Sequence, residues 1–167
     1  MFRLQIKKHD RVKLISYAYI YMQSQKYFIL LFFSILTLSF SAHASVAGSW
    51  SGSGDWIVEN STTGCSVNLS FDENSSELDR LGGNMDCDVV SMDTGSETLQ
   101  KVNDQLVLNG EVVGTWKQDY YDWTEVKQDA KIHTIIQVNG KHMDYEEIWT
   151  DNKDGSPIYD IKASLNQ

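Results

Sequence analysis

The chain contains little proline, little cysteine and no long uninterrupted apolar run. Its 167 residues include one proline, Pro157, so no proline-rich linker divides the sequence. The longest apolar run, Tyr27 to Phe40, has 14 residues, fewer than the ~20 that a helix needs to cross the hydrocarbon core of a membrane. Long helical periodicity is also absent beyond residue 45, which argues against a helical bundle.

The first 44 residues have the order of a signal peptide. The apolar run is followed by Ala42-His43-Ala44, an A-x-A cleavage pattern, and is preceded by a basic region with Arg3, Lys7, Lys8, Arg11, Lys13 and Lys26. We therefore predict a signal peptide over residues 1–44 and a mature chain that is secreted or periplasmic. Met22 is an alternative start, because Lys26 and the apolar run alone make a compact signal. An uncleaved anchor stays open; after cleavage we expect no stable membrane insertion.

The region after the leader is strongly acidic. Six of the 14 Lys and Arg residues precede residue 45, against one of the 23 Asp and Glu residues, which leaves 8 basic and 22 acidic residues and a formal charge of −14. Such a surface repels nucleic acid and anionic membranes, so neither is expected as a partner. The charge favours cationic partners or serves only to keep an exported protein soluble, and both interpretations stay open.

The two cysteines, Cys65 and Cys87, both follow the leader. In an oxidising compartment such a pair is expected to form a disulfide. A redox or metal site is the competing interpretation, but the spacing is not C-x-x-C and no histidine is close in sequence. We predict a structural Cys65–Cys87 bridge worth roughly 3 kcal/mol on the chain-entropy model.

Short apolar alternations recur through residues 45–167. Cys65, Val67, Leu69 and Phe71 alternate with polar residues, as in a strand with one buried face. Repeated strands of this length predict one all-β domain over residues 45–167, an antiparallel up-and-down β-barrel of about 8–10 strands with one disulfide. Residues 75–81 fit either a short helix or an edge strand, and Gly82-Gly83 is predicted to be a turn.

Three turn sequences predict how strands pair. Asn109-Gly110 and Asn139-Gly140 suit two-residue turns, and Lys153-Asp154-Gly155 suits a three-residue loop with Gly155 left-handed. The expected partners are Leu106 with Val113, Val107 with Val112, Ile136 with Met143, Thr134 with Tyr145, Ile132 with Glu147, Trp149 with Tyr159, Glu147 with Ile161, Tyr145 with Ala163, and Met143 with Leu165. The last three strands then share one apolar side.

Glu147 is the one carboxylate on that apolar side. Beside Tyr145, Trp149 and Tyr159, it is predicted to orient a ligand. Three other interpretations remain: an error in the pairing, a strand end that reaches water, or a structural hydrogen bond to Tyr145 or Tyr159. The ligand interpretation makes the protein a non-enzymatic binder of a small apolar or amphipathic molecule held in the barrel.

The first strand of the mature region is rich in glycine. Gly48-Ser49-Trp50 is followed by Gly52, Gly54 and Trp56, and glycines repeated inside a strand predict sharp bending or close backbone contact. Gly-x-Trp on the first strand of a small exported barrel resembles the calycin group, which includes lipocalins and avidins. The resemblance implies that Trp50 closes the barrel floor and that a ligand lies nearer to the open end.

Two features depart from that resemblance. Lipocalins carry a Thr-Asp-Tyr motif, whereas here Gln118 precedes Asp119-Tyr120. They also carry a late basic residue over the first tryptophan, and no arginine follows Arg80 in this chain. The resemblance therefore implies a shape rather than a ligand.

A second functional hypothesis comes from the aromatic run Tyr120-Tyr121-Asp122-Trp123. Consecutive aromatics in one strand or loop cannot all face inward, so at least one is expected to be exposed. Flanked by carboxylates, Tyr121 and Trp123 suit contact with a sugar ring or a protein. The alternative function is thus a secreted carbohydrate- or protein-binding β module with an extracellular glycan or protein as its partner.

No catalytic residue, metal or cofactor is predicted. His133 and His142 fall on the polar face of a hairpin and lack a G-x-S-x-G or related context. Residues 151–155 resemble the start of a calcium loop, but Lys153 occupies the third ligand position and no glutamate follows at the twelfth. The sequence favours a binding protein over an enzyme.

Overall fold

The computed structural model describes residues 45–167, and the predicted signal peptide over residues 1–44 lies outside the described residues. Within 45–167 there are eleven strands and no helix, hence no helix able to cross a membrane. The strands are β1 (Gly48–Val58), β2 (Ser61–Glu73), β3 (Glu77–Cys87), β4 (Ser91–Thr94), β5 (Glu97–Val102), β6 (Gln105–Leu108), β7 (Glu111–Lys117), β8 (Tyr120–Val126), β9 (Ala130–Asn139), β10 (His142–Asp151) and β11 (Pro157–Asn166).

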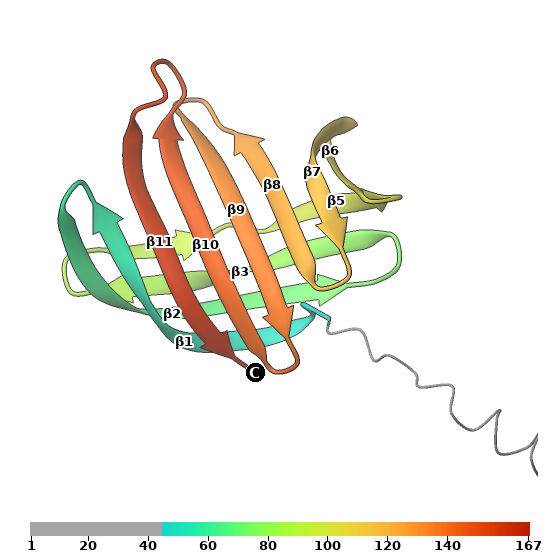
Figure 1. Ribbon diagram of the computed structural model, residues 1–167, viewed down its shortest axis with the longest axis horizontal. Coiled ribbons are helices and arrows are strands. Elements are labelled where there is room, and N and C mark those ends of the chain that lie inside the picture. The colour runs from blue at the N-terminus through green and yellow to red at the C-terminus, as the bar shows by residue number, and fades with distance from the viewer. Residues whose placement is uncertain (1–44) are drawn as a thin grey trace, which may run out of the picture. The chain divides into compact units, whose positions relative to one another are not determined.

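The strands form one antiparallel sheet that closes on itself as a ring (Figure 1). Neighbours follow the order β2-β1-β11-β10-β9-β8-β7-β6-β5-β3, and β3 also pairs with β2. β4 and β5 both pair with β3, at residues 83–86 and 77–80, so two short strands share one position around the ring. The predicted all-β antiparallel fold is confirmed, with eleven strands found where about 8–10 were expected.

The interior of the ring is filled by apolar side chains from every second residue of the strands. Cys65, Val67, Leu69 and Phe71 of β2 are all buried, as predicted, while the residues between them are exposed or half-buried. The same alternation on β8 to β11 buries a second wall of large side chains. Removing this apolar surface from water is the main stabilising contribution to such a fold.

The predicted register of the last two strands is confirmed. Met143, Tyr145, Glu147 and Trp149 of β10 face the expected partners on β11. The register between β9 and β10 is wrong by two residues: Tyr145 faces Ile136 and Glu147 faces Thr134. Strand pairing continues to Asn139 and His142, so the turn is Gly140-Lys141 rather than Asn139-Gly140. Because the shift is an even number of residues, every side chain keeps its predicted face.

The other two turns are close to expectation. Asn109 and Gly110 both have positive φ, at 54° and 86°, as a type I′ turn requires, and Val107 faces Val112. A bulge beyond that pair places Leu106 opposite Gly114 instead of Val113. Gly155 is left-handed as predicted, with φ of 73°. The loop runs from residue 152 to residue 156 rather than over the predicted three residues, because a bulge after Trp149 places Thr150 opposite Pro157.

The predicted turn at Gly82-Gly83 is wrong, because both glycines lie inside β3. A bulge there leaves Leu81 unpaired and 59% exposed, while Phe71 faces Arg80 and Ser70 faces Gly82. An inserted residue reverses the alternation. Arg80 before the bulge and Met85 after it consequently both point inward. Residues 77–81 are strand rather than helix, which resolves the two options for this segment.

Two further predictions on the first strands are confirmed. A Cβ atom on Gly52 would lie 2.2 Å from the carbonyl oxygen of Ser164, so β1 and β11 approach each other too closely for a larger residue. Cys65 of β2 and Cys87 of β3 face each other and form the predicted disulfide. The bridge closes one end of the β2–β3 hairpin.

Candidate functional site

One end of the ring interior contains a cavity of about 410 Å³, which we call the mouth cavity. Its volume falls within the range of ~300–1,000 Å³ that small-molecule sites usually have. The cavity is walled by apolar and aromatic side chains from β3, β4, β9, β10 and β11: Met85, Met92, Ile132, Trp149, Tyr159 and Ile161. The polar groups at its wall include Arg80, Thr94, Lys127 and Glu147.

Glu147 points into this cavity from β10 and is 4% exposed. Its neighbours two residues away on the same strand fix its carboxylate: the Tyr145 hydroxyl donates to Oε2, and the Trp149 indole N–H donates to Oε1 at 2.5 Å. The predicted inward direction of Glu147 is therefore correct, and so is the structural hydrogen bond to Tyr145. Tyr159 forms no such bond among the described residues and instead stacks on Trp149 at a centroid distance of 5.0 Å.

Arg80 extends into the interior from β3 toward three carboxylates, those of Glu97, Glu125 and Glu147. Its Nη2 lies 3.1 Å from Glu125 and 3.4 Å from Glu97, and its Nε donates to the Gly95 carbonyl oxygen at 3.1 Å. Its Nη1 is 3.9 Å from Glu147 Oε2 and forms no hydrogen bond within residues 45–167. One edge of a nearly buried guanidinium thus retains unused donors at the cavity wall.

A second cation completes what we call the mouth cluster, which consists of Arg80, Lys127, Glu97, Glu125 and Glu147. Lys127 Nζ lies 2.8 Å from Glu125 Oε2 and 3.3 Å from Glu97 Oε1. Three carboxylates therefore face two cations, a formal excess of one negative charge. An incompletely balanced group of charges in a site of low dielectric favours either a shared proton or a bound ligand.

The pKa values of Glu97 and Glu125 are shifted in opposite directions. Burial and the hydrogen bond and negative charge of Glu125 raise the pKa of Glu97 to about 7. Burial also opposes ionisation of Glu125, but hydrogen bonding with Glu97 and the charges of Arg80 and Lys127 outweigh it and lower the pKa of Glu125 to about 2. Near neutral pH the pair therefore carries part of one proton, which offsets the excess negative charge.

Two stacked aromatic rings form part of the cavity wall. Trp149 and Tyr159 lie nearly parallel, at 25°, and Trp56 packs against Tyr159 in a tilted arrangement at a centroid distance of 6.2 Å. Burial, followed by the negative charge of Glu147, raises the pKa of Tyr159, so its phenol stays protonated and can donate a hydrogen bond. A planar apolar molecule can stack on such a surface.

The prediction that Tyr121 and Trp123 form an exposed binding surface is wrong. They are 0% and 1% exposed, because the alternation of β8 turns residues 121, 123 and 125 inward and leaves Tyr120 on the outer face. The Trp123 indole N–H donates to Glu125 at 3.0 Å and so supports the mouth cluster. Tyr121 lies at the other end of the interior.

Of the six predicted ligand-binding residues, the structure places Glu147, Trp149 and Tyr159 at the mouth cavity. Tyr145 and Trp123 support its carboxylates from behind, and Tyr121 is remote. Sequence reasoning missed Arg80 and Glu125. Tyr121, Trp123 and Glu125 alternate along β8 as Tyr145, Glu147 and Trp149 do along β10, so the sequence could have predicted the inward direction of Glu125. The inward direction of Arg80 depends on a bulge that was not predicted.

The opposite end of the interior holds a different polar group, the floor cluster of Glu73, Lys101, Tyr121, Ser45 and Val46. Glu73 accepts hydrogen bonds from Lys101 Nζ at 2.7 Å and from the Tyr121 hydroxyl at 2.5 Å. Burial opposes its ionisation, but hydrogen bonds from Lys101, Tyr121 and Ser45 outweigh that effect and lower its pKa. This end shows one carboxylate with a full set of donors.

Trp50 belongs to the floor end. It is 1% exposed, and its indole N–H donates to the Val46 carbonyl oxygen at 2.6 Å. Trp50 lies six residues before Trp56 on β1, which corresponds to about 20 Å of strand. Trp56 pairs with Ile161 at the mouth cavity. Trp50 and the mouth cavity therefore occupy opposite ends of the interior.

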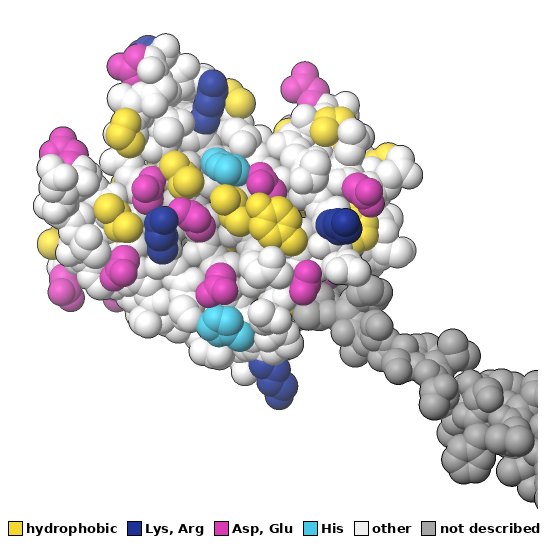
Figure 2. Space-filling view, in the orientation of Figure 1, with side chains coloured by type: hydrophobic (Ala, Val, Ile, Leu, Met, Phe, Trp, Pro, Cys, Tyr) yellow, Lys and Arg dark blue, Asp and Glu magenta, His cyan; other side chains and the backbone are white. Residues whose placement is uncertain are grey.

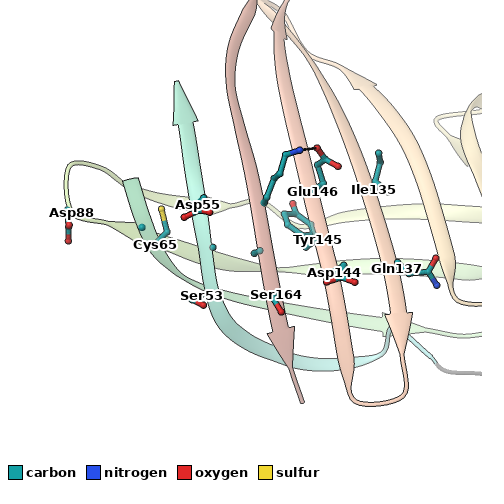
Figure 3. A pocket seen from close by; sticks show the side chains of 14 residues that line it. Ser53, Asp55, Cys65, Asp88, Ile135, Gln137, Asp144, Tyr145, Glu146 and Ser164 are labelled. Carbon is teal, nitrogen blue, oxygen red and sulfur yellow. Dashed lines mark ion pairs between the residues drawn. The ribbon is translucent and has the colours of Figure 1, made fainter. Parts of the chain in front are cut away.

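A larger hollow of about 890 Å³ lies on the outer face of β1, β9, β10 and β11 (Figure 3). Polar side chains such as Ser53, Gln137 and Ser164 line it, together with the charged residues Asp55, Asp88, Asp144, Glu146 and Lys162. Figure 2 shows that acidic side chains are spread widely over the face made by β8 to β11. This hollow is open and lacks an aromatic wall, since the ring of its one aromatic residue, Tyr145, is buried inside.

The fold is similar to that of a solved structure, the S-type phycobiliprotein lyase CPES from Guillardia theta. The TM-score is 0.55, with 10% sequence identity over 73% of this chain and 88% of that chain. At that identity the likeness shows the fold alone. No protein-family model matches the chain. No curated protein matches it either.

Proposed function

We propose that the protein is an exported, calycin-like binding protein that holds a small amphipathic molecule in the mouth cavity and catalyses no reaction on it. The observation that carries the proposal is the fixed carboxylate of Glu147 at the wall of a 410 Å³ cavity, beside an Arg80 edge with unused donors. A few oriented polar groups on an apolar wall are the usual composition of a small-molecule site.

The chemistry of the wall defines the ligand class. Trp149 and Tyr159 offer a stacked aromatic surface, and Met85 and Met92 offer adaptable apolar contacts. Arg80 Nη1 can donate to a carbonyl, carboxylate or sulfonate oxygen of the ligand. The best occupant is therefore a flat apolar molecule that carries one hydrogen-bond acceptor. The lyase in the structural comparison supports the fold of this proposal and not its reaction.

A titration with two fluorescent probes tests the proposal. 8-Anilinonaphthalene-1-sulfonate carries an anionic acceptor for Arg80, and N-phenyl-1-naphthylamine has the same aromatic body without it. Both are expected to bind with increased emission, and their difference in affinity measures the attraction of the sulfonate to Arg80 against its repulsion by the carboxylates of the mouth cluster. Trp149→Ala is expected to weaken both at least about tenfold, a loss of ~1.4 kcal/mol. Glu147→Gln is expected to change the preference between the two probes.

Neighbouring residues supply matched controls. Glu146 is next to Glu147 but faces outward, where it pairs with Lys162 at 2.8 Å. Glu146→Gln removes the same charge from the same strand and should leave probe binding unchanged. Ile148→Ala is the corresponding control for Trp149→Ala. Equal binding by Trp149→Ala and Ile148→Ala, with both variants folded, would remove the mouth cavity as the site.

We also propose a secreted or periplasmic location. The support is the disulfide between Cys65 and Cys87, which is typical of oxidising compartments, together with the leader predicted from the sequence. Cell fractionation with a thiol count on the recovered protein tests this. Recovery of a reduced protein from the cytosol would contradict it.

A further inference from the structure

The residues directly after the predicted cleavage site are anchored to the floor of the ring. Ser45 Oγ donates to Glu73 Oε2 at 2.8 Å, and the Val46 backbone N–H reaches the same oxygen at 3.3 Å. The Val46 side chain is fully buried, and its carbonyl oxygen accepts the Trp50 indole bond. Gln167 Nε2 donates to the Ala47 carbonyl oxygen at 2.6 Å, which ties the same segment to the last residue of the chain.

This anchoring is more than a surface contact. The Glu73 side chain is only 9% exposed, and the Lys101 side chain that pairs with it is 5% exposed. Lys101 also lies over the Trp116 ring at 3.8 Å. A buried carboxylate with both oxygens occupied orders whatever donors reach it. The chain therefore places a charged acceptor at the point where a cut after Ala44 would create a new terminus.

We propose that cleavage between Ala44 and Ser45 supplies Glu73 with the α-ammonium group of Ser45, which replaces the long Val46 N–H contact at Oε2, and that this ion pair completes the closure of the floor. Hydrolysis of that amide by an export peptidase consumes one water molecule and leaves a carboxylate on Ala44 and an ammonium on Ser45. The inference rests on the proposed export and is independent of the ligand proposed for the mouth cavity.

The geometry favours the ammonium over the uncleaved amide. The α-nitrogen of Ser45 is attached to the Cα that carries the hydroxymethyl group already bound to Glu73, and the next backbone nitrogen reaches the same oxygen. An uncleaved amide has one N–H and no charge, whereas the ammonium has three donors and a positive charge. Charge-assisted hydrogen bonds are about twice as strong as neutral ones. Processing and closure of the floor are thus coupled.

The test starts from the protein recovered after export, whose intact mass should correspond to a chain that begins at Ser45. Residues 45–167 contain all eleven strands, so this chain can then be compared with one extended by Gly-Ala before Ser45. At pH 6 the extended chain is expected to unfold about 3–6 °C lower, as loss of one charge-assisted contact implies for a domain of this size. The difference should shrink above pH 9, where the α-amine loses its charge.

Glu73→Gln should remove the difference between the two chains. If Glu73→Gln does not fold, acylation by an amine-reactive ester provides the second measurement, because an ion-paired α-amine should react several-fold more slowly than the amine of the extended chain. A mature terminus elsewhere than Ser45 would overturn the proposal. Equal melting temperatures together with equal acylation rates would overturn it as well.

Discussion

The two ends of the ring interior both bury charged side chains, but they balance those charges differently. Each end buries charge among aromatic side chains. At the floor, one carboxylate, Glu73, is matched by Lys101 and by a tyrosine hydroxyl. At the mouth, three carboxylates share two cations, and a 410 Å³ cavity adjoins them.

Under the proposed function, this difference separates a structural polar group at the floor from a ligand-binding one at the mouth. A fully matched buried network stabilises one conformation. An incompletely matched network beside a cavity costs stability, and a site that binds a polar ligand is a common reason for a protein to retain it. The floor is therefore interpreted as a closure and the mouth as the binding end.

The largest expected effect is the loss of Arg80. Arg80→Met removes the cation that contacts Glu97 and Glu125 and leaves buried carboxylates with Lys127 alone. Breaking such a buried pair costs about 3–5 kcal/mol. Lys101→Met at the floor is expected to cost less, because Tyr121 and Ser45 still donate to Glu73.

Urea denaturation of both variants measures this order. Lys131→Met on the exposed surface is the control and should fall within about 0.5 kcal/mol of the parent protein. A larger loss for Lys101→Met than for Arg80→Met would contradict the interpretation of the mouth as the less balanced end.

A smaller effect is expected from two matched tyrosine substitutions. Tyr121→Phe removes a donor to Glu73, and Tyr145→Phe removes a donor to Glu147. Each hydrogen bond to a charged group contributes about 1.5–3 kcal/mol, so both variants should lose similar stability. Only Tyr145→Phe should also weaken binding of the naphthalene probes. Equal effects of both substitutions on binding would mean that the cavity is not the site.

The smallest expected effect is a pH dependence of stability between pH 4.5 and pH 7, which comes from Glu97 at the mouth. Burial and Glu125 raise the pKa of Glu97 to about 7, so the folded state binds a proton that the unfolded state releases near pH 4.5. Stability from this group is present at low pH and is lost as pH rises from about 4.5 through 7. Glu125 has a pKa of about 2, so its contribution to stability has the opposite pH dependence: it is present above pH 4.5 and is lost as the pH falls toward 2.

Glu97→Gln isolates the contribution of Glu97 to the pH dependence of stability. The amide cannot ionise, so the decline in stability between pH 5 and pH 8 should flatten, and the variant should gain on the parent protein as pH rises. Thermal melts across that range provide the measurement. An unchanged slope in Glu97→Gln would assign the pH dependence to other groups.

Sequence reasoning succeeded where periodicity decides the outcome. The alternation of β10 and β11 predicted the inward direction of Glu147, Trp149 and Tyr159, and an error of two residues in the β9–β10 register left those faces unchanged. The same rule applied to β8 would have turned Tyr121 and Trp123 inward, because residues two apart share a face. The prediction was wrong because it chose Tyr121 and Trp123 as the exposed aromatics, whereas the alternation of β8 leaves Tyr120 on the outer face.

The remaining parts of the site depend on contacts that periodicity does not encode. Arg80 faces inward because β3 bulges at Leu81, and glycines that allow a bulge also suit a turn. Glu97 and Lys127 reach the mouth cluster only after the ring has closed and brought β5 beside the end of β8. The cavity is the space that the packed side chains of several strands leave unfilled, and local sequence patterns do not predict such a space.

Tryptophan indole N–H resonances test the central claim most directly. The Trp149 indole donates to Glu147 at the mouth, and the Trp50 indole donates to Val46 at the floor. In a ¹H–¹⁵N spectrum recorded during titration with 8-anilinonaphthalene-1-sulfonate, the Trp149 indole signal should shift strongly while the Trp50 signal stays in place. A shift of Trp50 without Trp149, or no shift of either at saturating probe, would contradict a binding site at the mouth.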